Sequence, residues 1–398
     1  MGEEYTIAPV KYEKAPDLKT ACRLLRVIAK RPVLFTARKV DKPLVLYGAS
    51  NFGKLAKEYL ERLCIPFLCV VDKYPDLYRK DPFWAGVDIF GIQDVPLHIR
   101  ESSLLAICVA LVPFSQVTTP LREQGWRDVV PFYDIAEAYR GLHPLSNGWY
   151  SGTLSEGDIC GIESVLSRWE DDISRAHHLQ FIAWHSLREE WFFDDAPVTT
   201  SDRYFIPQVL RALRDNEVFV DIGAHHGEVI ILFMEAVKNK FKEIYAIEPD
   251  GENFSKLRNC LEKNMPGEKG KIHLLECAVG SMENHKPFYR GLGYASQFSE
   301  LGQTDVNVKA LDDMSIPATF IKIHIEGWER SAISGGLETI MTNRPILTVT
   351  AYHNRDGLWK LPDEIMSHLD NYIYYFRVHS WLGTGAVIYA IPRERINL

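Results

Sequence analysis

One short turn in the second half of the chain has the residue types to hold a nucleotide-like ligand. An apolar run from Val218 to Val220 ends in Asp221 and passes through Gly223 and Gly227 into a second apolar run. This pattern predicts a buried strand, a tight turn and a helix, the first crossover of an α/β sheet. Glycines let the backbone approach a ligand closely, and the helix N-terminus offers free N–H groups. The Asp-x-Gly-x-x-x-Gly spacing differs from the Gly-x-Gly-x-x-Gly of dinucleotide sites.

Two later segments would complete a nucleoside pocket beside this turn. A predicted strand ends in Glu248 and Pro249, and Glu248 follows Gly227 by about twenty residues, the spacing at which an acid accepts both ribose hydroxyls. A lone glutamate at a strand end would face solvent, but beside the glycine turn we favour the ribose role. A third predicted strand leads into Ala278 and Val279, whose small side chains would leave room for an adenine ring.

The stretch from Thr319 to Glu329 alternates isoleucines with ionisable residues. In a strand, three ionisable side chains would point to one face: Lys322, His324 and Glu326. A central parallel strand is normally apolar on both faces, so these groups are costly there unless they pair or serve a site. An edge strand with one wet face is the structural alternative. We favour a functional site, because the stretch stands where a fourth parallel strand is expected and runs into a glycine turn.

The elements that precede this half predict a smaller Rossmann-like α/β domain in residues 1–145. Its expected helix and strands, in order, are Leu18–Lys30, Leu44–Tyr47, Pro66–Val71, Leu104–Ala110 and Val129–Phe132. The turn from Gly48 to Gly53 lacks the middle glycine of a dinucleotide site, and Asp72 stands where a ribose-binding acid would lie. A functional nucleotide site and a vestigial scaffold both stay open.

Residues 146–212 predict a helical linker, and residues 213–398 the second α/β domain. The linker holds His178 and His185 on one helical face, a spacing compatible with a metal site. We favour partly exposed helix histidines, because no set of four ligands closes around them. Near the end of the chain, two apolar strands joined by a Gly-Thr-Gly turn predict an antiparallel hairpin.

Several spaced motifs of residues 200–398 together resemble the FkbM family of S-adenosylmethionine-dependent methyltransferases. In order they are Val-Asp-Ile-Gly-Ala at 220–224, Ile-Glu-Pro at 247–249, Ala-Val-Gly at 278–280, Leu-Asp-Asp at 311–313, Ile-Lys-Ile-His-Ile-Glu-Gly-Trp-Glu at 321–329, Arg-Pro-Ile at 344–346 and Tyr-His at 352–353. The resemblance implies a class I methyltransferase fold, a mostly parallel seven-stranded sheet with a C-terminal antiparallel hairpin. It also implies S-adenosylmethionine as cofactor and methyl transfer to hydroxyl oxygens of sugars, polyketides and related metabolites.

On this basis we assign the cofactor contacts to nine residues: Asp221, Gly223, Ala224, His225, Gly227, Glu248, Pro249, Ala278 and Val279. The chain departs from the family pattern at two positions. His225 stands where the family usually has Asn, and His324 where it has Asp. An imidazole thus replaces a carboxylate near the ammonium and sulfonium groups of the cofactor. The site is retuned, uses His324 as a base, or is inactive.

Methyl transfer is an in-line displacement, so an enzyme must mainly align nucleophile, methyl group and sulfur. An alcohol must also lose its proton, which a histidine or glutamate can accept. We therefore predict His324, Glu326 and Lys322 as catalytic residues, with His353 as a weaker candidate. This assignment contains no metal ligand; a metal site formed by His324, Glu326 and His353 is the runner-up. A non-catalytic cofactor- or nucleotide-binding scaffold protein is the alternative from a different class of function.

The net charge and the cysteine content limit which partners and which compartment we expect for the chain. The net charge of −8 argues against broad binding to nucleic acids or anionic membranes, which need a basic surface. Seven scattered cysteines without a Cys-x-x-Cys pair indicate reduced thiols and a cytoplasmic protein, and no apolar run is long enough to cross a bilayer. We expect a small-molecule or glycan acceptor, and a homodimer is compatible with the sequence, which does not identify the acceptor.

Overall fold

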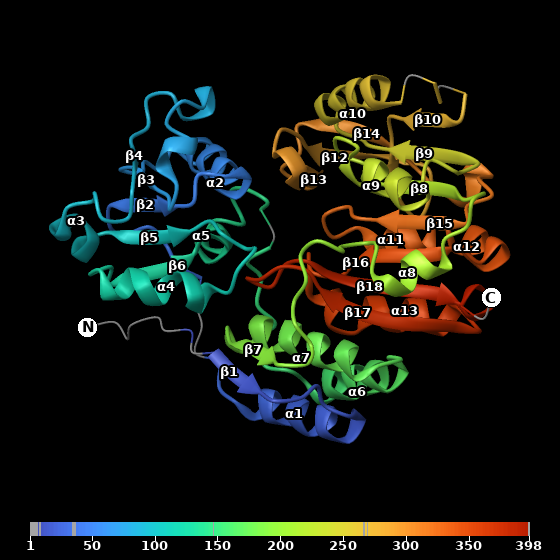
Figure 1. Cartoon of the computed structure of the whole chain (residues 1–398), viewed down its shortest axis with the longest axis horizontal. Coiled ribbons are helices and arrows are strands. Elements are labelled where there is room, and N and C mark those ends of the chain that lie inside the picture. Colours follow the sequence, from blue (N-terminus) through green and yellow to red (C-terminus); the bar gives the residue numbers. More distant parts are fainter. Residues whose placement is uncertain are drawn as a thin grey trace.

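The computed structural model describes residues 7, 9–33, 37–145, 147–265, 267–268 and 270–396. Two α/β units stand side by side above a helical layer (Figure 1). The blue-to-teal unit on the left holds the elements from β2 to α5, and the unit on the right those from α8 to β18. We call them the N-terminal unit and the C-terminal unit.

The N-terminal unit is built on a five-stranded parallel sheet of order β4-β3-β2-β5-β6. The strands are β2 (Leu44–Tyr47), β3 (Val70–Val71), β4 (Ile89–Phe90), β5 (Leu104–Ile107) and β6 (Asp128–Pro131). The helices are α2 (Asn51–Arg62), α3 (Leu97–Ser102), α4 (Phe114–Glu123) and α5 (Phe132–Ala138). This order has β2 in the centre with β3 and β5 beside it, as in Rossmann-like sheets. The predicted smaller Rossmann-like α/β fold is confirmed, although the strand expected over Pro66–Val71 is reduced to its last two residues.

The helical layer brings together two segments that are far apart in the sequence. Strand β1 (Pro9–Tyr12) pairs in parallel with β7 (Glu190–Phe193). Helix α1 (Leu18–Lys30) packs on α6 (Glu156–Arg168) and α7 (Asp172–Leu187). Residues 9–30, which we expected within a domain of residues 1–145, therefore pack with the segment that we expected to be a linker. We propose this layer as a third structural unit.

The histidines of this layer are structural. His178 accepts a hydrogen bond from Trp169 Nε1 at 3.0 Å, and its Nε2 lies 2.8 Å from the carbonyl oxygen of Leu358. The two ring nitrogens of His185 contact backbone carbonyl oxygens at 2.9 and 3.0 Å. Both rings are fully buried. The expectation of partly exposed histidines was therefore wrong, because α7 lies against strand β17 of the C-terminal unit rather than against solvent.

The C-terminal unit contains a seven-stranded sheet of order β10-β9-β8-β15-β16-β18-β17. Its strands are β8 (Val218–Ile222), β9 (Glu243–Ile247), β10 (Ile272–Leu275), β15 (Phe320–Ile323), β16 (Ile346–Thr350), β17 (Tyr372–Val378) and β18 (Ala386–Pro392). The first five are parallel, and β18 runs antiparallel to both β16 and β17. This arrangement confirms the predicted mostly parallel sheet with a C-terminal antiparallel hairpin.

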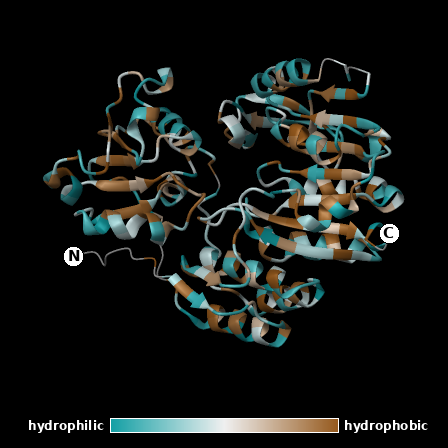
Figure 2. Cartoon of the chain, viewed as in Figure 1, coloured by the Kyte–Doolittle hydropathy of each residue, from teal (hydrophilic) through white to brown (hydrophobic). Residues whose placement is uncertain are grey.

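Helices and apolar side chains cover both faces of this sheet. The main helices are α8 (Pro207–Ala212), α9 (Glu228–Ala236), α10 (Gly251–Asn264), α11 (Glu329–Ser334), α12 (Leu337–Asn343) and α13 (Lys360–His368). Two separate apolar clusters lie on the two faces, and every residue of β8 is buried. Figure 2 shows brown segments concentrated on the strands, while the helices carry both brown and teal segments. Among the described helices, none has the length and apolar character needed to cross a membrane.

An insertion between β10 and β15 connects the two units. Strands β11 (Ala278–Val279), β12 (Asn284–Tyr289), β13 (Gln297–Phe298) and β14 (Thr304–Lys309) form a mixed sheet of order β11-β14-β12-β13. In Figure 1, β12 and β13 lie on the side of the C-terminal unit that faces the N-terminal unit. Leu292 and Ala295 belong to the apolar cluster of the N-terminal unit, so the insertion packs directly on it.

Candidate active site

The backbone conformation of the turn after β8 requires glycine. Gly223 has φ of +79°, and a Cβ atom there would lie 2.0 Å from the carbonyl oxygen of His324. Gly227 has φ of +91° and precedes the first residue of α9. Because side chains rarely adopt this region and none fits against His324, the sequence has to place glycine at the first position. The turn therefore brings the ends of β8 and β15 into direct contact.

A buried ion pair lies directly beneath the turn. Asp221 and Lys322 are paired residues of adjacent strands, and Lys322 Nζ lies 2.7 Å from Asp221 Oδ1. The exposed fractions are 0% for Asp221 and 1% for Lys322. Lys322 also donates a hydrogen bond of 2.6 Å to the carbonyl oxygen of Gly223. Burial raises the pKa of the Asp221 carboxyl, and the ammonium of Lys322 opposes that rise. The pair ties the turn to β15.

Glu248 stands at the end of β9 with both carboxylate oxygens oriented by backbone N–H groups. His225 N donates to Oε2 at 2.9 Å, and Asp250 N donates to Oε1 at 3.0 Å. Glu248 is 5% exposed, and burial raises the pKa of its carboxyl group. Each oxygen of a carboxylate has two lone pairs, so one remains on each for a ligand hydroxyl.

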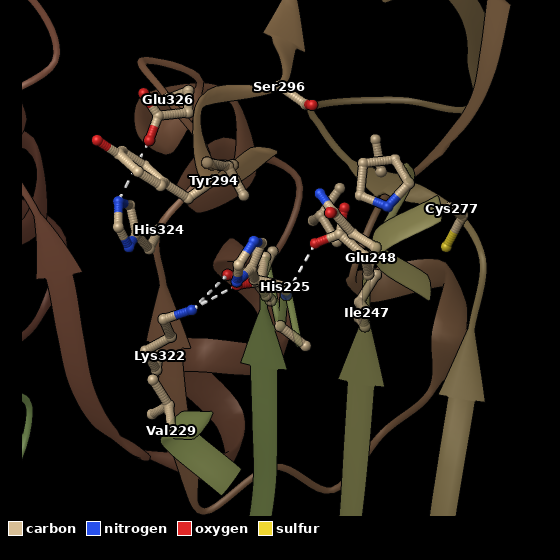
Figure 3. Close-up of a pocket in the computed structure, with 18 of the residues that line it drawn as sticks. His225, Val229, Ile247, Glu248, Cys277, Tyr294, Ser296, Lys322, His324 and Glu326 are labelled. Carbon is tan, nitrogen blue, oxygen red and sulfur yellow. Dashed lines mark hydrogen bonds and ion pairs between the residues drawn. The ribbon is translucent and has the colours of Figure 1, made fainter. Parts of the chain in front are cut away.

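A cavity of about 210 Å³ opens between the glycine turn, the end of β9 and the insertion. Figure 3 shows the labelled side chains of Lys322, Glu248 and Tyr294 around it. Seven of the nine predicted cofactor contacts line the cavity: Gly223, Ala224, His225, Glu248, Pro249, Ala278 and Val279. Asp221 and Gly227 do not line it. Asp221 lies behind the cavity wall and contacts it through its ion pair with Lys322.

His324 lies just beyond the end of β15 and lines the cavity. The Tyr204 hydroxyl is 2.9 Å from its Nδ1, and the Tyr352 hydroxyl is 3.0 Å from its Nε2. Burial holds the pKa of His324 well below its usual value. The expectation that His324 and Glu326 lie on the same strand as Lys322 was wrong, because β15 ends at Ile323 and the chain turns at Glu326 and Gly327.

Glu326 occupies that turn in a left-handed conformation, with φ of +50°. Its Oε1 lies 3.3 Å from His324 Nε2 and 3.2 Å from His353 Nε2. The dashed line between His324 and Glu326 in Figure 3 marks the first of these contacts. Burial would raise the pKa of Glu326, but the positive charge of His353 lowers it below the usual value. The predicted catalytic pair is thus brought together by a turn and not by strand alternation.

His353 connects this turn to Glu329, the first residue of α11. His353 Nδ1 lies 2.6 Å from Glu329 Oε1, and both side chains are buried. Glu329 Oε1 also accepts a hydrogen bond of 2.9 Å from Thr350 Oγ1. Burial would lower the pKa of His353, but the carboxylates of Glu326 and Glu329 hold it well above its ordinary value. His353, the weaker catalytic candidate, therefore belongs to the same cluster as His324 and Glu326.

The insertion closes the other side of the cavity. Tyr294 and Phe298 line it, whereas Tyr289 does not and instead packs against His143 of the N-terminal half, with ring centroids 5.0 Å apart. Asp250 Oδ2 accepts a hydrogen bond of 2.9 Å from Ser296 Oγ. The insertion that carries this aromatic wall thus contacts Asp250, just after β9, through Ser296, and contacts His143 through Tyr289.

Three contributors to the site lie outside the predicted set. Arg203 and Tyr204 precede α8 and line the cavity, and Asn253 of α10 lines it beside Glu248. Arg203 Nη2 donates a hydrogen bond of 3.1 Å to the Tyr352 hydroxyl. Its Nε is buried and has no hydrogen-bond partner in the described part of the chain. These residues have no motif spacing of their own, so only long-range packing reveals them.

Comparisons with known proteins bear on the family and the fold of the chain. Residues 221–376 match the family model of the methyltransferase FkbM domain. A crystal structure of methyltransferase FkbM from Methylobacillus flagellatus KT aligns with a TM-score of 0.61 and 21% sequence identity, over 94% of this chain and 98% of that one. A precorrin-6y C5,15-methyltransferase from Geobacter metallireducens GS-15 aligns with a TM-score of 0.31 and 18% identity, over 50% of this chain and 95% of that one. No curated protein sequence matches.

The first alignment covers 94% of this chain, so its fold extends over both α/β units and the helical layer. The matched family segment begins at Asp221, inside the strand that leads into the glycine turn, and ends within β17. It therefore contains the turn, Glu248 and the His324–Glu326 turn. Residues 221–376 of this chain therefore form a methyltransferase domain of the FkbM family.

Proposed function

We propose that the chain is an S-adenosylmethionine-dependent O-methyltransferase that acts on a hydroxyl of a sugar-containing or secondary-metabolite acceptor. The observation that carries the cofactor assignment is Glu248. Two backbone N–H groups orient its carboxylate at the end of β9, beside the glycine turn, where it faces the cavity. Such a carboxylate suits the two hydroxyls of an adenosine ribose.

The rest of the cofactor follows from this anchor. The adenine ring would lie along Ile247, Cys277, Ala278 and Val279, a largely apolar wall of the cavity. The methionine end would then reach the glycine turn and Arg203. The unpartnered Nε of Arg203 offers a charged donor for the methionine carboxylate. Lys322 is already engaged by Asp221 and Gly223, so we propose that it positions the turn rather than contacting the acceptor.

The acceptor would enter on the side of Tyr294, Phe298, His324 and Glu326. Aromatic side chains suit the apolar face of a sugar ring. In the reaction the bond between sulfur and methyl carbon breaks, its electron pair goes to sulfur, and the hydroxyl oxygen bonds the methyl carbon. The hydroxyl proton leaves during or after attack. His324 and Glu326 are the polar groups that we propose interact with this hydroxyl.

Calorimetric titration of the full chain with S-adenosylhomocysteine tests the cofactor assignment. We expect binding that is weakened at least about tenfold in Glu248→Gln, because losing one charged hydrogen bond costs about 1.5–3 kcal/mol. Glu252→Gln is the matched control, since this side chain is 71% exposed and pairs with Lys256. Unchanged affinity in Glu248→Gln would refute the ribose role.

Methyl transfer is then measured with labelled S-adenosylmethionine across a panel of sugar-containing and secondary-metabolite alcohols. Methylation of a hydroxyl in this panel supports the O-methyltransferase proposal. If S-adenosylhomocysteine binds but no alcohol of the panel is methylated, the non-catalytic scaffold becomes the better explanation. If neither cofactor form binds at millimolar concentration, the proposal fails.

A further inference from the structure

We propose that His324, Glu326 and His353, here called the His-Glu-His cluster, form a binding site for a divalent transition-metal cation of the Zn²⁺, Fe²⁺ or Mn²⁺ class. This inference rests on the proposed methyltransferase function, because the cation would lie where the acceptor hydroxyl has to bind. Two histidines and one carboxylate are the protein ligands of many catalytic sites of this class, which leave further positions open to a substrate oxygen.

The spacing of the ligand atoms fits one shared cation. Glu326 Oε1 lies 3.3 Å from His324 Nε2 and 3.2 Å from His353 Nε2. Two ligands at about 2.0–2.2 Å from a cation, at right-angled to tetrahedral angles, lie roughly 3.0–3.5 Å apart. The three candidate ligand atoms all lie within 4.8 Å of one another. The two rings are stacked with centroids 5.1 Å apart, so they have to move inward for all three ligand atoms to meet one cation.

Each histidine is also oriented as a ligand would be. Glu329 Oε1 lies 2.6 Å from Nδ1 of His353, and the Tyr204 hydroxyl lies 2.9 Å from Nδ1 of His324. In both rings Nδ1 is thereby occupied, and Nε2 points toward Glu326. Metal-bound histidines commonly have such a partner on the second nitrogen, which fixes the tautomer and the ring orientation.

A second observation is independent of the spacing. Oε2 of Glu326 has no hydrogen-bond partner among the residues that the structure describes, although Glu326 is only 7% exposed. A buried carboxylate oxygen without a partner is costly. Glu326 also adopts φ of +50°, and such backbone outliers persist where surrounding structure enforces them, often at functional sites. A cation bound by both carboxylate oxygens, or by Oε1 with a bound water on Oε2, would satisfy this atom.

Two neighbouring features bear on the site. The Tyr352 hydroxyl lies 3.0 Å from Nε2 of His324, so cation binding requires this hydroxyl to turn aside or to become a further ligand. A second group, His225, His226 and Glu228, also has ligand atoms within 4.8 Å of one another. Its Glu228 side chain is 65% exposed and its two rings are stacked 3.6 Å apart, so it lacks the enclosed carboxylate of the His-Glu-His cluster.

The cluster opens toward the cavity, since His324 and Glu326 line it whereas His353 lies behind them. A cation there would present its open positions to the acceptor. It would hold the acceptor hydroxyl oxygen and favour loss of its proton. In this proposal His324, which stands where the family pattern has aspartate, is a ligand of the cation.

Metal binding is tested on the untagged full chain after chelator treatment, by calorimetry with Zn²⁺ and by visible absorption with Co²⁺. We expect one cation per chain and a Co²⁺ spectrum of nitrogen and oxygen ligands. Thiolate charge-transfer bands would instead indicate the exposed Cys64 and Cys160 and would overturn the proposal. We expect Glu326→Gln and His353→Gln to weaken binding at least about 100-fold and Glu228→Gln to leave it unchanged.

Three further results would overturn the site: no binding at about 100 µM cation, equal affinity in Glu326→Gln and the parent chain, or loss of binding in Glu228→Gln. Because His353 is buried and its substitution can unfold the chain, Glu326→Gln, which keeps size and shape, is the deciding variant. Binding of S-adenosylhomocysteine to the chelated chain is measured in parallel. Cofactor binding without cation binding refutes only the metal site, whereas absence of cofactor binding refutes the proposed function.

Discussion

Replacing Lys322 by methionine tests whether this residue positions the glycine turn or takes part in acceptor chemistry. The change keeps a long side chain but leaves Asp221, which is 0% exposed, without its partner at 2.7 Å. Breaking a buried pair by removing one partner costs about 3–5 kcal/mol. The lost hydrogen bond of 2.6 Å to the carbonyl oxygen of Gly223 adds to this cost. We therefore expect β8 and β15 to open much more readily in Lys322→Met.

The cost depends on pH in a defined direction. Burial raises the folded-state pKa of Asp221, and the other charged groups near it are Lys322 of β15, His225 of the turn and Glu228 of α9. Without Lys322 that pKa rises further. The folded state then binds a proton that the unfolded state has released, so stability is lost as pH rises from the unfolded pKa, about 3.9, through the folded pKa. The destabilisation should be smaller at pH 5 than at pH 8.

Native-state hydrogen exchange at the backbone amides of β8 and β15 measures this opening free energy directly, which avoids assuming two-state unfolding for a chain of several units. The double variant Asp221→Asn with Lys322→Met is the matched control, and it should recover most of the loss because no buried charge remains. Exchange unchanged in Lys322→Met at pH 8, with methyl transfer abolished, would refute the positioning role and place Lys322 at the reacting groups.

Four further outcomes follow from the same geometry. Gly223→Ala should destabilise the C-terminal unit by at least about 2 kcal/mol in thermal and denaturant unfolding, because its Cβ would lie 2.0 Å from a backbone oxygen. Arg203→Lys should weaken S-adenosylhomocysteine binding about tenfold or more in calorimetry, and equal affinity would remove Arg203 from the cofactor. Affinity should fall as pH falls through the raised pKa of Glu248, since the ribose needs the carboxylate form, and Glu248→Gln should show no such fall. His225→Asn should change the affinity less than twofold, because His225 contributes its backbone N–H to Glu248.

The fold was largely predictable because its signals are local. Apolar runs that end at glycine turns predicted the parallel strands, and amphipathic spacing predicted α1 with its observed bounds, Leu18–Lys30. The helices against which α1 packs could not be predicted from local sequence. Its buried face, Ala21, Leu25 and Ile28, meets helices more than a hundred residues later, and hydropathy does not specify which apolar surface will cover it.

The site was predictable only where residues share a motif. Gly223, Glu248 and Ala278 have motif spacing, and all three line the cavity. The alternation around His324 suggested a strand, but Gly327 follows Glu326, and both have positive φ, at +101° and +50°. Gly327 is a turn signal, and it outweighed the alternation. The sequence analysis did not identify Glu329. Its contacts with Thr350 and His353 form only because α11 packs against the end of β16, and local sequence does not predict that packing.

The two departures from the family pattern affect different parts of the chemistry. His225 has φ of +51°, a conformation in which Asn and His are both favoured over most residues, and its contribution to Glu248 is a backbone N–H. We therefore expect exchange of one for the other to leave the proposed cofactor contact of Glu248 intact. His324 contributes its side chain, with one ring nitrogen toward Tyr204 and the other toward Tyr352 and Glu326. An aspartate there would place a second carboxylate beside Glu326 and remove one nitrogen ligand of the proposed cation site. Under the proposed function, we therefore expect a change of residue 324 to alter binding of the acceptor hydroxyl and to leave cofactor binding unchanged.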